Sequence, residues 1–373
     1  MIITPENFPF VVTLAFIIFT NLLSLPFQLL TRGRDTWLAN FIIVSGVALL
    51  LDSLIMSNEF GISVMSNLLG IDSPNLSVTW TNLAIGVIMI IIGIWLQNKL
   101  RQRIYVFNMY GVVPRDISDE KAIHELKIAE YKLKEHVVNI FPILKAGCLE
   151  NGGNKAICDH IEHESHKFSN RAANKATCYT GMAPLPYTVF AGTCLASANI
   201  QRYLEFNRND GERFYELKPQ RWWNRVCLRS WQSLEVESTS NILSDASEVV
   251  LAISITSRIA DADLTQFGDI NVVRIGLAKP ADNVITCIQR LMEYNQAICD
   301  CIETTIKKML PNLDTVNIVA SIPSCVALEL GKNIARGGNR LTSIAVYHFE
   351  AHHTPKYKYG VYVNGSKKGN LVQ

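Results

Sequence analysis

The sequence predicts an α/β protein in which three N-terminal transmembrane helices and a helical connector precede a larger region of strands and helices. Three apolar segments with almost no charge lie within the first 98 residues, and a charged helical stretch follows. Short apolar strands then alternate with helices, a pattern typical of mainly parallel sheets covered by helices. The expected domains are the membrane unit 1–103, the connector 104–176 and the C-terminal region 177–373.

The three apolar segments run over residues 8–30, 38–56 and 78–96. Each has close to the ~20 residues that cross a hydrocarbon core of about 30 Å. The first is too long, and too poor in N-terminal positive charge, for a cleaved signal peptide. Buried core helices are the alternative, but three such segments in succession with almost no charge favour membrane spans.

The loop charges predict the orientation of these segments. Arg32 and Arg34 follow the first segment, and Lys99 and Arg101 follow the third, whereas the loop 57–77 has no basic residue. Because basic loops stay on the cytoplasmic side, the N-terminus is expected outside and the C-terminal region in the cytoplasm. The protein is thus predicted to be a multi-pass protein of the cell membrane.

Two polar residues in the apolar segments, Asp52 and Asn21, are candidates for membrane function. Ionisable groups in a span usually face a helix partner or a water-filled path. The alternative for Asp52 is that it reaches the headgroups from the outer end of its helix. Gly86 and Gly93 share one face of the third segment and predict a close helix contact. Residues 61–70 are too short to span and are expected at the outer interface.

Charge and cysteine content exclude several classes of protein. The 373 residues carry a formal charge of +2, but the first 98 carry −3 and the remainder +5. That balance favours an anionic ligand and is too small to indicate a DNA or RNA polymer as partner. The nine cysteines are irregularly spaced, which indicates reduced thiols and no disulfide framework.

The connector is predicted to be helical. A helix is expected over 118–141, with Ser118 as its N-cap and an apolar stripe of helical period. Downstream, a short segment contains one cysteine and three histidines that a helix would place near one another: Cys158, His160, His163 and His166. A metal site is one reading, but no HExxH motif or distant ligand accompanies them, and a solvated polar helix is favoured. No metal is expected.

The C-terminal region contains most of the predicted strands. A helix is expected over 282–309, and residues 191–193 form a small-residue turn after the first strand. The segments 200–206 and 213–217 are separated by Asn209, Asp210 and Gly211, which indicates a hairpin. The predicted strands are 185–190, 200–206, 213–217, 249–256, 272–277, 316–320, 343–349 and 358–363.

The stretch Asp314–Ile334 predicts a buried strand, the turn Ser321–Ser324 and a helix that begins near Pro323. Free backbone N–H groups and serine hydroxyls at a helix N-terminus form a site suited to phosphate. The alternative is an ordinary connection with a serine cap. A second hydroxyl-rich strand end, Ser254–Arg258, supports the binding interpretation, because ligands of open α/β sheets bind beyond the carboxyl ends of the strands.

The candidate ligand-binding residues combine these two strand ends, the turn at 191–193, and a basic aromatic cluster that offers phosphate pairing and base stacking. They are Ser254, Thr256, Ser257, Arg258, Ser321, Pro323, Ser324, Lys356, Tyr357 and Thr193. Walker, GxGxxG, GxSxG and HExxH motifs are all absent from the sequence. No catalytic residue and no cofactor are therefore expected.

Several segments in order resemble the SAVED domain. They are PLPYTVFAGTCLA, VVLAISITSRI, AICDCIETTIKK, NIVASIPSCVALELGKNI, and SIAVYHFE before KYKYGVYVNG. The resemblance implies two fused CARF-like, Rossmann-like subdomains that sense a cyclic oligonucleotide, with a cyclic trinucleotide as the expected ligand. It further implies an effector of CBASS anti-phage defence, with the ligand made by a partner nucleotidyltransferase.

The function expected from the resemblance is that of a ligand-gated effector of the inner membrane. Ligand binding would drive homo-oligomerisation, and the clustered membrane helices would disrupt the bilayer and cause cell death or growth arrest. One alternative is a ring nuclease or phosphodiesterase that uses His348, His352 and His353. Another is a membrane-anchored interaction module, for which Arg258 and Lys356 would be dispensable.

Overall fold

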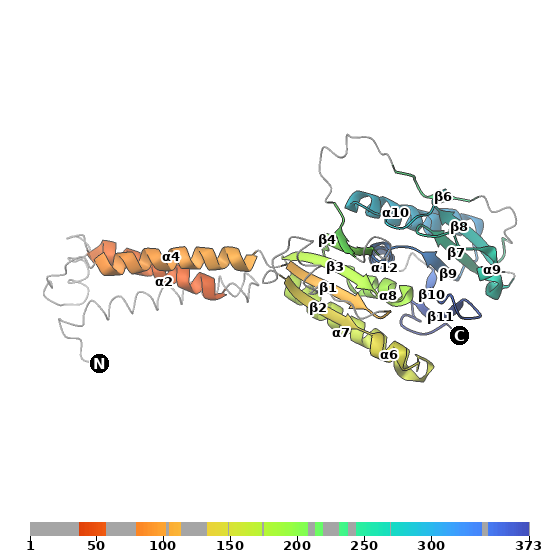
Figure 1. Ribbon diagram of the computed structural model, residues 1–373, viewed down its shortest axis with the longest axis horizontal. Coiled ribbons are helices and arrows are strands. Elements are labelled where there is room, and N and C mark those ends of the chain that lie inside the picture. Colours follow the sequence, from red (N-terminus) through yellow and green to blue (C-terminus); the bar gives the residue numbers. More distant parts are fainter. Residues whose placement is uncertain are drawn as a thin grey trace. The chain divides into compact units, whose positions relative to one another are not determined.

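The computed structural model describes two compact units, Met1–Arg103 and Ile104–Gln373, and each is treated by itself (Figure 1). The described residues are 37–56, 80–101, 104–112, 133–147, 149–173, 175–207, 213–218, 231–237, 244–268, 270–337 and 342–372. The predicted segment 8–30, residue Asn21, the stretch 61–70 and the helix start at 118 lie outside these ranges.

In the N-terminal unit, helices α2 (Trp37–Met56) and α4 (Trp80–Arg101) pack against each other in antiparallel fashion. A Cβ added to Gly86 would lie 2.9 Å from the carbonyl oxygen of Gly46, and one on Gly93 would lie 3.1 Å from that of Ala39. These glycines therefore let the two backbones approach closely, as the sequence predicted for Gly86 and Gly93.

Large apolar side chains are exposed on both helices of this pair. Ile91 is 60% exposed and Trp95 is 59% exposed. The others are Leu38, Phe41, Val47, Ile85, Val87, Ile88, Ile92 and Ile94. Among the helices in the described ranges, none combines the length and the apolar character that crossing a membrane requires.

The C-terminal unit contains two sheets with the same strand order. The first has the order β2-β1-β3-β4-β5, with β5 antiparallel to β4 and the other pairs parallel. The second has the order β11-β10-β9-β7-β8-β6. Its strands β8, β7, β9, β10 and β11 repeat the order of the first sheet, including the antiparallel last strand. The unit is therefore built as two similar halves, each with the 2-1-3-4-5 order of flavodoxin-like folds.

The bounds of the strands are β1 Ile104–Tyr110, β2 Leu133–Asn139, β3 Ala176–Met182, β4 Arg202–Asn207, β5 Arg213–Glu216, β6 Glu235–Val236, β7 Glu248–Ser254, β8 Asn271–Gly276, β9 Thr315–Ser321, β10 Ser343–Phe349 and β11 Tyr357–Tyr362. The helical elements are α6 Phe141–Lys145, η2 Leu149–Gly153, α7 Asn154–Ala172, α8 Leu185–Cys194, α9 Asp261–Leu264, η4 Thr265–Phe267, α10 Ile288–Asp300, η5 Cys301–Ile306, α11 Lys307–Met309 and α12 Ser324–Gly337.

Predictions about secondary structure are wrong in two parts of the chain. Residues 185–190 form the first part of helix α8 and not a strand. This helix is buried on nearly all sides, so its apolar residues show no helical period and look like those of a buried strand. The expected helical connector 104–176 contributes β1 and β2 to the first sheet. The first half thus begins at Ile104 and not near residue 177.

Helices α8 and α12 join the two halves through a contact between glycines. A Cβ on Gly192 would lie 2.1 Å from the carbonyl oxygen of Leu328, and one on Gly331 would lie 1.9 Å from that of Val189. Both helices follow the central strand of their sheet, β3 or β9. Each begins one residue after a proline, Pro184 or Pro323, and each glycine lies eight residues after its proline. The repeat therefore extends to the residues that join the halves.

We expect Gly192→Ala or Gly331→Ala to destabilise the C-terminal unit by ~1–3 kcal/mol or more, because the added methyl group meets a backbone carbonyl that cannot rotate away. Chemical denaturation of the purified variants measures this loss. Ala156→Ser, which also adds one heavy atom to a helix but at an exposed position of α7, is the control. Equal stability of the glycine variants and the control would contradict the tight contact.

Candidate functional site

The carboxyl ends of the two sheets converge on a cavity of about 720 Å³. This volume lies within the ~300–1,000 Å³ that is usual for small-molecule sites. Most of the residues that line it come from the ends of β3, β4, β9 and β10 and from the starts of α8 and α12, and the others include Tyr215 of β5 and Asp282. Among them, Glu205, Asp282 and Glu350 are acidic, and none of the described lining residues is Lys or Arg. We call this space the acidic cavity.

A hydroxyl cluster forms one wall of the acidic cavity. The Ser321 Oγ lies 2.7 Å from the Thr256 Oγ1 and 2.7 Å from the Ser257 Oγ, and the backbone N–H of Ser257 donates to it at 3.2 Å. The Ser324 hydroxyl lies 2.6 Å from the Tyr179 hydroxyl of β3. The two predicted hydroxyl-rich strand ends are thus brought together, and their hydroxyl groups bond mainly to one another and to β3.

The N-terminus of α12 already holds a carboxyl group of the protein itself. The backbone N–H of Cys325 donates to the Oε1 of Glu205, which reaches it from β4 in the other half. Burial raises the pKa of Glu205 to about 7, and hydrogen bonds from Cys325 and Ser324 oppose that rise. The prediction of a phosphate floor at Ser321–Ser324 overlooked this carboxyl group, which is 120 residues away in the chain. The site suited to phosphate is taken by Glu205.

His348 occupies the position in the second half that Glu205 occupies in the first. In the first sheet, Cys178 of β3 pairs with Arg202 of β4. In the second sheet, Asn317 of β9 holds the position that corresponds to Cys178, and it pairs with Ala345 of β10. Three residues further along their strands lie Glu205 and His348, and both line the acidic cavity. Burial lowers the pKa of His348, which keeps its imidazole neutral.

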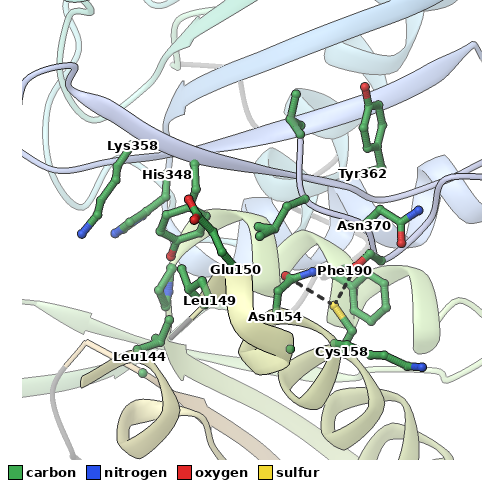
Figure 2. Close-up of a pocket in the computed structure, with 18 of the residues that line it drawn as sticks. Leu144, Leu149, Glu150, Asn154, Cys158, Phe190, His348, Lys358, Tyr362 and Asn370 are labelled. Atoms are coloured by element: carbon green, nitrogen blue, oxygen red, sulfur yellow. Dashed lines mark hydrogen bonds between the residues drawn. The ribbon is translucent and has the colours of Figure 1, made fainter. Parts of the chain in front are cut away.

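A second cavity, of about 1470 Å³, adjoins the first and is shown in Figure 2. The residues that line both cavities are Val112, Pro184, His348 and Glu350. Four lysines line the larger cavity, which we therefore call the lysine cavity: Lys155, Lys358, Lys367 and Lys368. Acidic residues are also present, and two pair with these lysines: Glu350 lies 3.6 Å from Lys358, and Glu162 lies 3.7 Å from Lys368.

A buried hydrogen-bond network fixes the inner wall of the lysine cavity (Figure 2). Asn154 of α7 donates to the carbonyl oxygen of Gly369 at 2.7 Å and accepts from the Tyr187 hydroxyl of α8 at 3.0 Å. The thiol of Cys158 lies beside them, 3.7 Å from the same carbonyl oxygen. Because buried polar groups that are all paired hold one geometry, this wall is preorganised.

Thr256, Ser321, Pro323 and Ser324 of the predicted ligand-binding residues line the acidic cavity. Ser254 instead accepts a hydrogen bond from the Ile259 N–H. The remaining predicted residues, which line neither cavity, are Ser257, Arg258, Lys356, Tyr357 and Thr193.

The contacts of these remaining residues explain their positions. Arg258 is largely exposed and lies 3.3 Å from Glu237. The ammonium group of Lys356 donates to the carbonyl oxygen of Ala351. Tyr357 is buried in the core on the other side of the second sheet, where its ring packs against Phe267. Thr193 is buried and donates to the Phe190 carbonyl oxygen at 2.7 Å, because residues 191–193 belong to α8 and not to a turn.

The two groups of histidines considered in the sequence lie in different parts of the C-terminal unit. Cys158 and the three following histidines lie on α7, and the described residues hold no cluster of three or more His, Cys, Asp or Glu side chains fit for a metal ion. Of the candidates for nuclease chemistry, His348 lines the cavities, whereas His352 and His353 are exposed.

Sequence reasoning missed Glu205 as a site residue. The sequence feature that could have indicated it is a single acidic residue inside the otherwise apolar strand sequence YLEF. It also missed the matching Pro-to-Gly spacing of α8 and α12, which would have identified 185–190 as the counterpart of the α12 start and not as a strand.

The raised pKa of Glu205 predicts a pH-dependent stability. The group binds its proton more tightly in the folded state than in the unfolded one, so it stabilises the fold below about pH 4.5, and this stabilisation is lost as pH rises to about 7. We expect the difference in the free energy of unfolding between the wild type and Glu205→Gln to fall by up to roughly 3 kcal/mol between pH 5 and 8. Urea unfolding at a series of pH values measures it. Glu303→Gln, at an exposed position, is the charge-matched control. Parallel curves for the wild type and Glu205→Gln would contradict the buried carboxyl.

Comparisons with known proteins found solved structures and one family model that are similar to this chain. Similar solved structures include the Acinetobacter baumannii Cap4 SAVED/CARF-domain containing receptor with 2′3′3′-cAAA (11% identity, TM-score 0.40, 85% of this chain and 64% of that chain covered). The same receptor with 3′3′3′-cAAA shows 12% identity and a TM-score of 0.40, with 84% and 64% covered. The chain thus spans 64% of the length of these receptors. The curated proteins gave no match. The family model of SAVED matches residues 161–363, which is more than half of the chain; its full description is "SMODS-associated and fused to various effectors sensor domain". The protein therefore belongs to the SAVED family.

Proposed function

We propose that this protein is a non-enzymatic sensor that binds a cyclic oligonucleotide, with a cyclic trinucleotide as ligand, in the joined acidic and lysine cavities. The observation that carries the proposal is the place of these cavities. They adjoin at the carboxyl ends of the strands, where open α/β sheets bind nucleotides. Membership of a sensor family supports a ligand-binding role, and the similar receptors named above were solved with cyclic trinucleotides.

The further steps of the proposal follow the CBASS scheme. A partner nucleotidyltransferase supplies the ligand, binding drives homo-oligomerisation, and the N-terminal helices then disrupt the inner membrane. Support for a lipid partner comes from the apolar side chains that α2 and α4 expose, including Ile88, Ile91 and Trp95. Exposed apolar surface on this scale marks an interaction with a membrane or another protein.

Binding is tested by thermal and chemical unfolding of the full-length protein in detergent against cyclic di-, tri- and tetra-adenylates. A ligand at 100 times its dissociation constant stabilises a folded state by about 2.7 kcal/mol if it binds that state alone. We expect this stabilisation with the cyclic trinucleotide. No stabilisation by any member of the panel would contradict the sensor function.

The same mixtures test the nuclease alternative, for which the half-buried position of His348 beside both cavities is the supporting observation. Chromatography of the bound ligand after long incubation should return the intact ring. Linear product that disappears in His348→Asn would instead identify an enzyme, because a neutral imidazole near a ligand is a candidate general base.

Leakage of a dye from vesicles that contain the full-length protein tests the membrane step. We expect leakage only when the ligand is added, and less leakage with Asp52→Ala at unchanged ligand affinity, because an ionisable group in a span serves a helix contact or a water path. Asn98→Ala, at the other end of the helix pair, is the control. Equal leakage from wild type and Asp52→Ala would show that Asp52 has no part in the membrane step.

A further inference from the structure

We propose that Glu205 determines base specificity: its carboxylate accepts a hydrogen bond from the exocyclic amino group of a nucleobase that enters the acidic cavity, while the ligand's phosphates lie in the lysine cavity. The inference rests on the proposed function, because it assigns the parts of a cyclic oligonucleotide to the two cavities.

The charges of the lining residues separate the two cavities by chemistry. The lysine cavity has four ammonium groups and four carboxyl groups, and two of the lysines pair with Glu162 and Glu350. It is nevertheless the one of the two cavities whose lining offers ammonium groups to a phosphate. The acidic cavity has three carboxyl groups and no Lys or Arg among its described lining residues, so a phosphate placed there would meet like charge. A nucleobase carries no charge, and its flat faces suit the apolar part of this lining, which includes Phe206, Tyr215 and Ile322.

The surroundings of Glu205 determine what it can bind. Its Oε1 accepts the Cys325 N–H, and the Ser324 backbone and the Cys325 side chain also hydrogen-bond to the carboxyl group, so it is held in place at the start of α12. Glu205 as a whole is 7% exposed, and it is one of the residues that line the acidic cavity. The carboxylate form offers acceptors only. It therefore selects a base edge that donates, such as the amino group of adenine or cytosine, and disfavours a carbonyl at the same place.

Hypoxanthine provides a sharp test because it replaces the amino group of adenine by a carbonyl oxygen. The full-length protein in detergent at pH 8, where the carboxylate form dominates, is titrated with 3′3′3′-cyclic triadenylate and with its tri-inosine counterpart. One hydrogen-bonded base edge discriminates by ~1–3 kcal/mol, so the wild type is expected to bind the adenine ring about tenfold more tightly or better. In Glu205→Gln the amide oxygen still accepts the Cys325 N–H, and the new amide N–H₂ accommodates the carbonyl. The preference should then fall by about tenfold or reverse.

Two control variants separate base reading from general electrostatics. Lys358→Gln, on the side assigned to phosphate, should weaken both ligands by the same factor and leave their ratio unchanged. Glu303→Gln changes net charge as Glu205→Gln does, but at an exposed position, and should change neither affinity.

The outcomes distinguish this inference from the function on which it rests. If the wild type binds neither ring, the sensor function itself is wrong. If it binds both rings equally, or if Glu205→Gln folds and keeps the wild-type ratio, the ligand is bound but Glu205 does not read its base. The wild-type comparison needs no variant, so equal binding of the two rings overturns the inference even if Glu205→Gln does not fold.

Discussion

The backbone contact between α8 and α12 is the constraint on which the rest of the C-terminal unit depends. With glycine at positions 192 and 331, each helix lies against a carbonyl oxygen of the other, and no larger residue fits without displacing a helix. Each helix follows the central strand of its sheet, so this contact sets how the two sheets meet (Figure 1). The carboxyl ends of both sheets then face one shared space, and the acidic cavity is the result.

Helix α12 is also joined to the opposite half by polar contacts. On β4, Tyr203 donates its hydroxyl to Glu329 of α12, and Glu205 accepts the Cys325 N–H one turn earlier in that helix. Glu329 in turn forms a buried ion pair with Lys332 at 2.6 Å. Removing one partner would leave an unpaired buried charge, which is strongly unfavourable. These contacts therefore add specificity to the geometry that the glycines permit.

Sequence patterns predicted the elements whose local residue pattern matches their place in the fold. They did not predict elements whose structure depends on contacts with distant parts of the chain. The β7 and β9 strands are apolar runs covered on both faces, and the β4–β5 hairpin has clear turn residues, so all three were identified. Helix α8 was taken for a strand because it is buried on all sides and therefore has no polar face. Four of the ten predicted site residues line a cavity, because strand-end position is visible in sequence. The carboxyl group at the α12 N-terminus could not be predicted from the sequence, since Glu205 reaches it from the other half of the repeat.

The two halves are equivalent in topology but not in chemistry, and this difference is what a ring-shaped ligand would meet. Glu205 and His348 stand at matching places, one an acceptor bonded to α12 and the other a neutral imidazole on β10, the strand against which α8 packs. A group that bonds to Glu205 shares that carboxyl with the first turn of α12, and α12 is locked to α8 through Gly331. Recognition at this one carboxyl group is therefore linked by direct contacts to the interface that holds both halves together.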